Sequence, residues 1–170
     1  GVNRLHCNIE SAPSFFQEVC TTHTAEEKAE NIQRAQKAGI RVCCGGILGL
    51  GETLDQRVEM AFHLKKLHID AIPLNVLNPI PGTPYEHNEP LAPLEILRSF
   101  AMFRFVLPKA QIRTAGGRQL NLRSLQSMAL AGGINGVMIG NYLTSKGSDP
   151  HDDLTMLRDL GRTRTMPNVQ

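Results

Sequence analysis

The chain alternates between short apolar runs and longer segments whose apolar residues recur every three or four positions. The first pattern is typical of buried β-strands, and the second is typical of amphipathic helices. Five such pairs follow one another, which predicts a parallel α/β architecture. The predicted strands cover residues 1–10, 41–52, 70–78, 111–114 and 136–140, and the predicted helices cover residues 25–38, 54–67, 93–106, 122–131 and 149–160.

Residues that favour helix ends support these bounds. Thr24 is a good N-cap residue, and Glu27 stands three positions further on, so the two can form a capping box. Thr53 is expected to cap the second helix, and Asn121 is expected to cap the helix over 122–131. These signals place the helix starts independently of the apolar pattern.

The stretch Arg41–Glu52, RVCCGGILGLGE, is the one around which the chain is organised. Its apolar residues suit a strand that is buried on both faces, and its four glycines leave the backbone bare for a flat ligand. On composition alone, a buried strand with a glycine turn is the simplest interpretation. Because side chains alternate along a strand, Cys43 and Cys44 should point to opposite faces. One thiol could then reach a barrel interior or a cleft.

Two architectures fit five parallel β/α units. A closed β/α barrel needs eight units and about 250 residues, so this chain would form part of one. An open doubly wound sheet is the alternative, although no GxGxxG phosphate fingerprint follows any strand. In a barrel, chemistry is found at the carboxyl ends of the strands. Polar residues gather at those ends in this sequence: His6, Asn8, Glu10, Glu52, Asn75, Arg113 and Arg118.

Composition narrows the class of protein. The 170 residues are 41% hydrophobic and 20% charged, as in ordinary globular proteins, and 18 basic against 16 acidic side chains give a net charge of +2. No basic face follows from this balance, so we expect no nucleic-acid or membrane partner. The weakly polar run over 128–140 is too short to span a bilayer. Four cysteines make no disulfide framework at this length, which favours a reducing cytoplasm.

The sequence supports neither a zinc site nor a hydrolase site. Zinc would need scattered ligands, because neither a CxxC pair nor an HExxH motif occurs. A serine or cysteine hydrolase is not indicated, because there is no GxSxG elbow and no histidine has an obvious nucleophile partner. The remaining histidines stand in loops or on helices and are expected to be solvated: His23, His63, His68, His87 and His151.

Four residues have both a structural and a functional interpretation. Cys43 is either a small buried apolar residue or a ligand of a metal cluster. Asn75 interrupts an apolar strand, so its amide must bond either to the backbone or to a ligand. Arg113 near an interior would need a carboxylate, an anion or an electron-rich cluster beside it. Glu52 is most simply an acid placed at a helix N-terminus.

Several segments together resemble the C-terminal half of the biotin synthase family of radical S-adenosylmethionine enzymes. The resemblance covers nearly the whole chain and rests on HCNIE, TTHT, AGIRVCCGGILGLGET, IPLNVLNPIPGTP, residues 98–108, IRTAGGR and GNYLT. It implies the last five or so units of a radical S-adenosylmethionine barrel over residues 1–161. Within them, an associated biotin and thiamin synthesis region would span about 77–161, followed by a polar tail over 162–170.

The resemblance also implies roles for individual residues. Cys43 and Arg113 would ligate an auxiliary iron–sulfur cluster, either 2Fe–2S or larger. Asn75 would hold the ureido ring of dethiobiotin, with His6 beside the substrate. The residues that would bind S-adenosylmethionine are Asn8, Glu10, Gly45, Ile47, Gly49 and Glu52. Glu10 stands where many members have Asp, and His6–Cys7 replaces the commoner Asn–His pair.

The implied reaction inserts sulfur into dethiobiotin. Electrons from a flavodoxin or ferredoxin, passed through a 4Fe–4S cluster, would cleave S-adenosylmethionine to a 5′-deoxyadenosyl radical, and the auxiliary cluster would supply the sulfur. Such a mechanism needs Cys43 and Arg113 on the same face of the sheet, close enough to touch one cofactor. At full length the family resemblance implies a homodimer.

The CxxxCxxC motif that holds the 4Fe–4S cluster in this family is absent from the 170 residues, as are two further upstream cysteines. We therefore expect a fragment that is poorly soluble or dependent on a partner when expressed alone, because its outer strands would have unpaired edges. Two alternatives stay open. One is a related radical enzyme of the iron-hydrogenase maturation or methylornithine-forming type, and the other is a non-catalytic remnant.

Overall fold

The computed structural model describes residues 1–142 and 146–162. All but the first residue of the predicted polar tail lies outside the described residues, as do Leu143 and Thr144 of the GNYLT segment. None of the helices in the described part is long and apolar enough to cross a membrane.

The described strands form one parallel sheet. They are β1 (Arg4–His6), β2 (Arg41–Cys43), β3 (Gly46–Leu48), β4 (Ala71–Val76), β5 (Gln111–Thr114) and β6 (Gly136–Val137). Their spatial order is β1-β2-β4-β5-β6, with β3 also paired to β4, so it follows the chain order. A doubly wound sheet would reverse its order at a switch point. The expected partial barrel is therefore confirmed, and the doubly wound alternative is wrong.

The predicted strand over residues 41–52 is split into β2 and β3. The register against β4 is nevertheless continuous across the gap, with Cys43 opposite Ala71 and Gly46 opposite Leu74. Pro73 lies between these two pairs in β4. Because proline has no N–H to donate, the hydrogen-bond ladder loses one rung there. The split therefore has a cause in β4 rather than in the glycines of the strand itself.

Helices follow most strands. Their bounds are α1 (Phe16–Val19), α2 (Ala25–Lys37), α3 (Leu54–Lys66), α4 (Pro93–Val106), α5 (Arg118–Leu122), α6 (Gln126–Ala131) and α7 (Pro150–Asp159), with 3₁₀ turns at Pro13–Phe15 and Arg123–Leu125. The capping boxes at Thr24 and Thr53 are both formed. The predicted helix over 122–131 forms only in part: α6 covers its second half, whereas Arg123 has a positive φ of 53° and begins the 3₁₀ turn that separates α6 from α5.

Asn121 is also not the cap that the sequence predicts. It lies inside α5, buried, and its side-chain amide donates to Gly117 O at 2.8 Å and to Leu77 O at 3.2 Å. Asn121 thus ties α5 to the end of β4 instead of starting a helix. The short α1 turn was not predicted, because its four residues are too few for a helical period.

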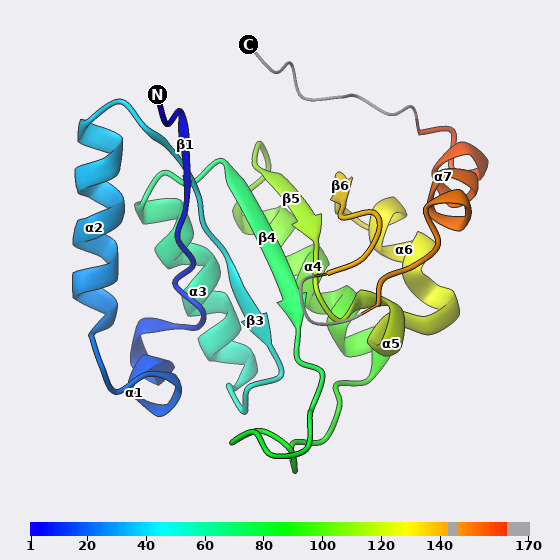
Figure 1. Ribbon diagram of the computed structural model, residues 1–170, viewed down its shortest axis with the longest axis horizontal. Coiled ribbons are helices and arrows are strands. Elements are labelled where there is room, and N and C mark those ends of the chain that lie inside the picture. Colours follow the sequence, from blue (N-terminus) through cyan, green and yellow to red (C-terminus); the bar gives the residue numbers. More distant parts are fainter. Residues whose placement is uncertain (143–145, 163–170) are drawn as a thin grey trace.

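The hydrophobic core lies between the helices and one face of the sheet. Ile72, Leu74 and Val76 of β4 point into it, together with Ile32 of α2 and Phe100 of α4. Helices α3 and α4 pack against each other on this side (Figure 1). Because side chains alternate, Pro73 and Asn75 point to the opposite face, which would be the inner face of a barrel.

Candidate functional site

Cys43 and Arg113 lie together on the inner face of the sheet. Arg113 Nη2 donates to Cys43 Sγ at 3.0 Å, across the intervening strand β4. The Cys43 side chain is buried, and Arg113 is half-buried. Arg113 Nε is buried and has no hydrogen-bond partner among the described residues. The two side chains thus meet the geometric requirement for sharing one cofactor, and the orphaned Nε–H is a spare donor facing the same region.

The neighbouring cysteine points the other way. Cys44 is completely buried and belongs to the hydrophobic core on the helix side. Burial raises the pKa of its thiol to about 12, so it stays protonated and unreactive at neutral pH. The predicted division of the cysteine pair between two faces is confirmed. His6 is in register with Cys43 but is exposed.

Asn75 bonds to the backbone on both sides. Its Oδ1 accepts from Gly116 N–H at 2.9 Å, and its Nδ2 donates to Gly46 O at 3.3 Å. These bonds link β4 to the loop after β5 and to β3. An amide has two donors and two acceptor lone pairs, so one of each is left for a ligand. Asn75 is half-buried, and Ile47, its partner in register, is half-buried as well.

The glycines of the organising stretch allow close backbone approach. A Cβ on Gly45 would overlap Pro73 O, and a Cβ on Gly46 would lie 2.5 Å from Glu10 O. Asn8 Oδ1 accepts from Gly45 N–H at 3.0 Å, and Glu10 O accepts from Ile47 N–H at 2.8 Å. The end of the β1 segment is therefore held directly against the glycine strand.

A β-bulge sets the position of Glu10. His6 pairs with Cys43, but Glu10 pairs with Gly46, so the β1 side contains one extra residue between the two pairs. Ile9 N–H and Glu10 N–H both donate to Gly45 O, and Glu10 has a left-handed φ of 62°. Burial raises the pKa of the Glu10 carboxyl, and the nearby Lys28 ammonium opposes that rise. Sequence reasoning missed Lys28, because its helical position gives no sign of its proximity to Glu10.

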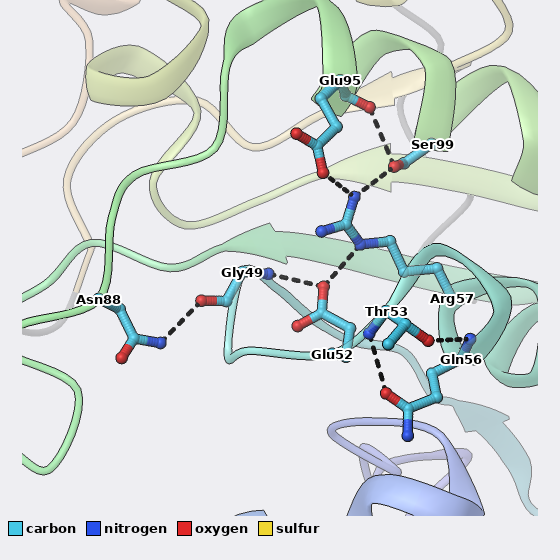
Figure 2. A network of polar contacts seen from close by, with 8 residues as sticks. All are labelled: Gly49, Glu52, Thr53, Gln56, Arg57, Asn88, Glu95 and Ser99. Atoms are coloured by element: carbon cyan, nitrogen blue, oxygen red, sulfur yellow. Dashed lines mark hydrogen bonds and ion pairs between the residues drawn. The ribbon is translucent and has the colours of Figure 1, made fainter.

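Glu52 holds the glycine turn that it ends. Its Oε1 accepts from Gly49 N–H at 2.8 Å and from Arg57 Nε–H at 2.7 Å (Figure 2). Gly49 has a φ of +96°, which favours glycine. Asn88 Nδ2 donates to Gly49 O at 3.2 Å, so the turn is fixed from both sides. Glu52 is therefore more than an acid at a helix N-terminus.

Arg57 extends this network into α4. Its Nη1 donates to Glu95 Oε1 at 2.8 Å and to Ser99 Oγ at 3.2 Å (Figure 2). The result is a buried chain of polar contacts from the glycine turn, through α3, to α4. Sequence reasoning missed Arg57, since a charged residue inside a helix is usually solvated and only its burial reveals the network.

Two groups of predicted residues lie elsewhere. Arg118 is buried, pairs with Asp153 of α7, and donates to Gln126 and to Met138 O, so it joins the C-terminal elements instead of a ligand site. Of the five histidines expected to be solvated, His23 and His63 are half-buried, which corrects that expectation for both. Burial lowers the pKa of His63.

The described residues contain no group of three or more His, Cys, Asp or Glu side chains that could hold a metal ion by themselves. Cys43 and Arg113 would therefore be a partial ligand set. A thiol and a guanidinium in contact, with an unpartnered buried N–H beside them, still fit an electron-rich cluster better than they fit a dication, because the guanidinium repels a bare cation.

Comparisons with solved structures agree with this architecture. Methylornithine synthase matches 98% of the chain with a TM-score of 0.79 at 19% identity, over 53% of its own length. HydG, a maturase of the FeFe hydrogenase, matches 95% of the chain with a TM-score of 0.73 at 15% identity, over 40% of its own length. At these identities the likeness concerns the fold, an α/β chain with a parallel sheet arranged as in part of a barrel.

Sequence comparisons give the family. Residues 1–64 match the Radical SAM superfamily, and residues 73–163 match the family described as the Biotin and Thiamin Synthesis associated domain. The chain belongs to the Biotin and Thiamin Synthesis associated domain family. It is 55% identical over 161 residues to a biotin synthase of Carboxydothermus hydrogenoformans and 56% identical over 163 residues to one of Maridesulfovibrio salexigens. These matches cover 95% and 96% of the chain, which spans about half the length of the curated relatives it matches.

Proposed function

We propose that this chain forms the substrate half of a biotin synthase, an enzyme that inserts sulfur into dethiobiotin by radical S-adenosylmethionine chemistry. The contact between Cys43 and Arg113 carries the proposal, because it brings the two candidate cluster ligands together on the face that also presents Asn75. The sequence relatives at more than 50% identity support the same assignment. Like those relatives, the active protein would be longer than this chain.

Cys43 and Arg113 would hold the auxiliary iron–sulfur cluster, with further ligands from outside these 170 residues. When bound, the two clusters and S-adenosylmethionine supply a carbon-centred radical and a sulfide to quench it. A charged guanidinium offers no free lone pair to a metal, so Arg113 would be a weak ligand and would contribute mainly by placing positive charge beside the cluster. Cys43 would be the stronger of these two ligands of the cluster.

Asn75 would form hydrogen bonds with the ureido ring of dethiobiotin. Its free N–H and its free lone pair lie on one amide, and a ureido edge offers a carbonyl acceptor next to an N–H donor, so the two edges are complementary. His6, exposed on the same face as Cys43, would border this substrate. The site would thus fix the substrate between its polar contacts and the sulfur source.

S-adenosylmethionine would lie across the glycine strand. Gly45 and Ile47 would face its adenine through the backbone, while Asn8 and Glu10 would bind its polar groups from the bulged end of β1. Gly49 would complete this surface at the turn. Glu52 would act by holding Gly49, since its bonded oxygen is already occupied by Gly49 N–H and Arg57.

We further propose the setting in which this chemistry takes place. A flavodoxin or ferredoxin would donate electrons, the full-length protein would be a homodimer, and the location would be the cytoplasm, where the four free cysteines of the described chain stay reduced. No role for nucleic acid or a membrane is proposed.

Asn75→Ala tests the proposal in the full-length protein, meaning the longest natural protein that contains this chain. We expect dethiobiotin to bind at least about tenfold more weakly by calorimetry, because a bidentate amide contact is lost. S-adenosylmethionine affinity should change little. Equal dethiobiotin affinity in the variant and the parent would contradict the assignment.

A further inference from the structure

One peptide group near the proposed substrate site is hydrogen-bonded at both ends. The peptide between Ala115 and Gly116 donates its N–H to Asn75 Oδ1 at 2.9 Å. Its carbonyl, on Ala115, accepts from the hydroxyl of Tyr142 at 2.8 Å. Because a carbonyl can only accept, the Tyr142 hydroxyl must be the donor in this pair. Asn75 and Tyr142 therefore hold opposite sides of the same rigid peptide plane.

These bonds belong to a longer series with a single direction. Gln119 Nε2 donates to Tyr142 Oη at 3.4 Å, and the series then passes through the peptide to Asn75, whose Nδ2 donates to Gly46 O at 3.3 Å. Each group between Gln119 and Gly46 O accepts a hydrogen bond from the group before it and donates one to the group after it. Hydrogen bonds in such a series polarise one another and strengthen.

The Tyr142 segment is itself anchored. Arg118 Nη2 donates to Met138 O at 3.1 Å, and the same guanidinium pairs with buried Asp153 of α7. The segment that leads to Tyr142 is thereby attached to buried structure at Met138, and the hydroxyl itself is bonded to Gln119 and to Ala115 O. This gives the buried Arg118–Asp153 pair a consequence at the inner face of the sheet.

The orientation of the Asn75 amide follows from this arrangement. Gly116 N–H requires an acceptor, so Oδ1 must point toward it, and Nδ2 must point toward Gly46 O. The backbone on either side is held by β4, because Ala115 N–H donates to Leu74 O and Val76 N–H donates to Gly116 O, each at 2.9 Å. Loss of the Tyr142 hydroxyl would remove the bond to the Ala115 carbonyl and leave Gly116 N–H held by Asn75 alone.

We propose that Tyr142 is a positioning residue that fixes the Asn75 amide for one orientation of a ureido ligand. This inference rests on the proposed function and adds a specificity-determining residue to it. Tyr142 acts through the Ala115–Gly116 peptide and contacts no reacting atom. It would favour a ligand that offers a carbonyl and an N–H along one edge over a ligand that offers two acceptors.

The test is a double-mutant cycle in the full-length protein with Asn75→Ala, Tyr142→Phe and the double variant. Dethiobiotin affinity is measured by calorimetry with S-adenosylmethionine present. We expect Tyr142→Phe to weaken dethiobiotin binding by about threefold to tenfold, which is the range for one neutral hydrogen bond. The same change should have no further effect in the Asn75→Ala background.

Two further measurements separate positioning from general damage. Hydrogen exchange of the Gly116 amide, followed by NMR, should become faster in Tyr142→Phe, and S-adenosylmethionine affinity should stay within about twofold. Tyr85→Phe is the matched control, since it makes the same chemical change at the other tyrosine of the chain, and it should leave both readouts unchanged.

The outcomes are distinguishable. Unchanged dethiobiotin affinity in Tyr142→Phe, or an equal loss in both backgrounds, overturns the inference while leaving the role of Asn75 intact. Unchanged Gly116 exchange also overturns it, since the peptide would then not depend on the hydroxyl. If Asn75→Ala itself binds dethiobiotin normally, the proposed function fails at this site and the inference fails with it.

Discussion

Arg113 Nη2 lies 3.0 Å from Cys43 Sγ, although 70 residues separate the two along the chain. The parallel register explains the meeting, because Arg113 pairs with Pro73 and Cys43 pairs with Ala71 on the same central strand. The long Arg113 side chain lies on the same face as Cys43, so it can reach across the single intervening strand β4. The contact is thus a consequence of topology and not of a local motif.

Cys43→Ala should remove the auxiliary cluster from the full-length protein. We expect iron and acid-labile sulfide per chain to fall by the content of one cluster, because the remaining guanidinium is a weak ligand. Cys44→Ala is the matched control, as the adjacent thiol lies on the core side. Equal iron content in the Cys43→Ala variant and the parent would refute the ligand assignment.

Arg57→Leu should destabilise the protein strongly. The side chains of Arg57 and Glu52 are only 4% and 2% exposed, so the change leaves a buried carboxylate without its cation. Breaking such a pair costs about 3–5 kcal/mol, which chemical denaturation can measure. Arg34→Leu removes an arginine from a pair whose side chains are 72% and 61% exposed, and it should cost less than about 0.5 kcal/mol. Similar losses in the two variants would contradict the network.

Gly45→Ala should be poorly tolerated. The added Cβ would overlap Pro73 O, a backbone atom that cannot move without shifting β4. We expect a loss of about 3 kcal/mol in the free energy of unfolding, at the upper end for overpacking. Gly1→Ala has nothing within 4 Å of the new Cβ and should be neutral. A Gly45→Ala variant as stable as its parent would show that β2 and β4 are not in this close contact.

Cys44 should make the protein less stable in alkali. Its pKa rises from an ordinary value of 9.0 to about 12 in the folded state because of burial. Between these values the unfolded chain loses a proton that the folded chain keeps, so stability falls as the pH rises through this range. The contribution is fully present below pH 9.

The comparison with Cys44→Ala isolates this effect. The variant should be less stable at pH 7, because it creates a small cavity in the core. Its deficit should shrink above about pH 9, since the variant has no thiol to titrate. A deficit that stays constant from pH 7 to pH 11 would show that Cys44 titrates alike in both states.

Local patterns predicted the elements that local forces determine. The capping box at Thr24 and the cap at Thr53 form as expected, because each involves residues only three positions apart. The opposite faces of Cys43 and Cys44 follow from strand alternation alone. The Asn121 prediction was wrong because this residue lies inside α5, where its amide also bonds to Leu77 O, an acceptor 44 residues away that no local pattern reveals.

Much of the candidate site depends on relationships between distant segments. Pro73 removes a hydrogen bond between β4 and the strand beside it, and the bulge before Glu10 lies between the β1–β2 pairing and the bridge from Glu10 to Gly46. The hydrogen bonds of Tyr142 and Asn75 to the Ala115–Gly116 peptide connect the segment after β6 to β4. Such contacts leave no periodic signal, so only the folded arrangement reveals them.

The backbone hydrogen bond missing at Pro73 lies between two pairs of residues on the inner face of the sheet. One pair is Cys43 and Arg113, and the other is Ile47 and Asn75. Pro73 lies between the two pairs on β4, where it donates no hydrogen bond to the β2–β3 side. A ligand on one pair would therefore act on backbone that one hydrogen bond fewer connects to the other pair. A proline inside a central strand thus weakens the backbone connection between the two proposed binding surfaces.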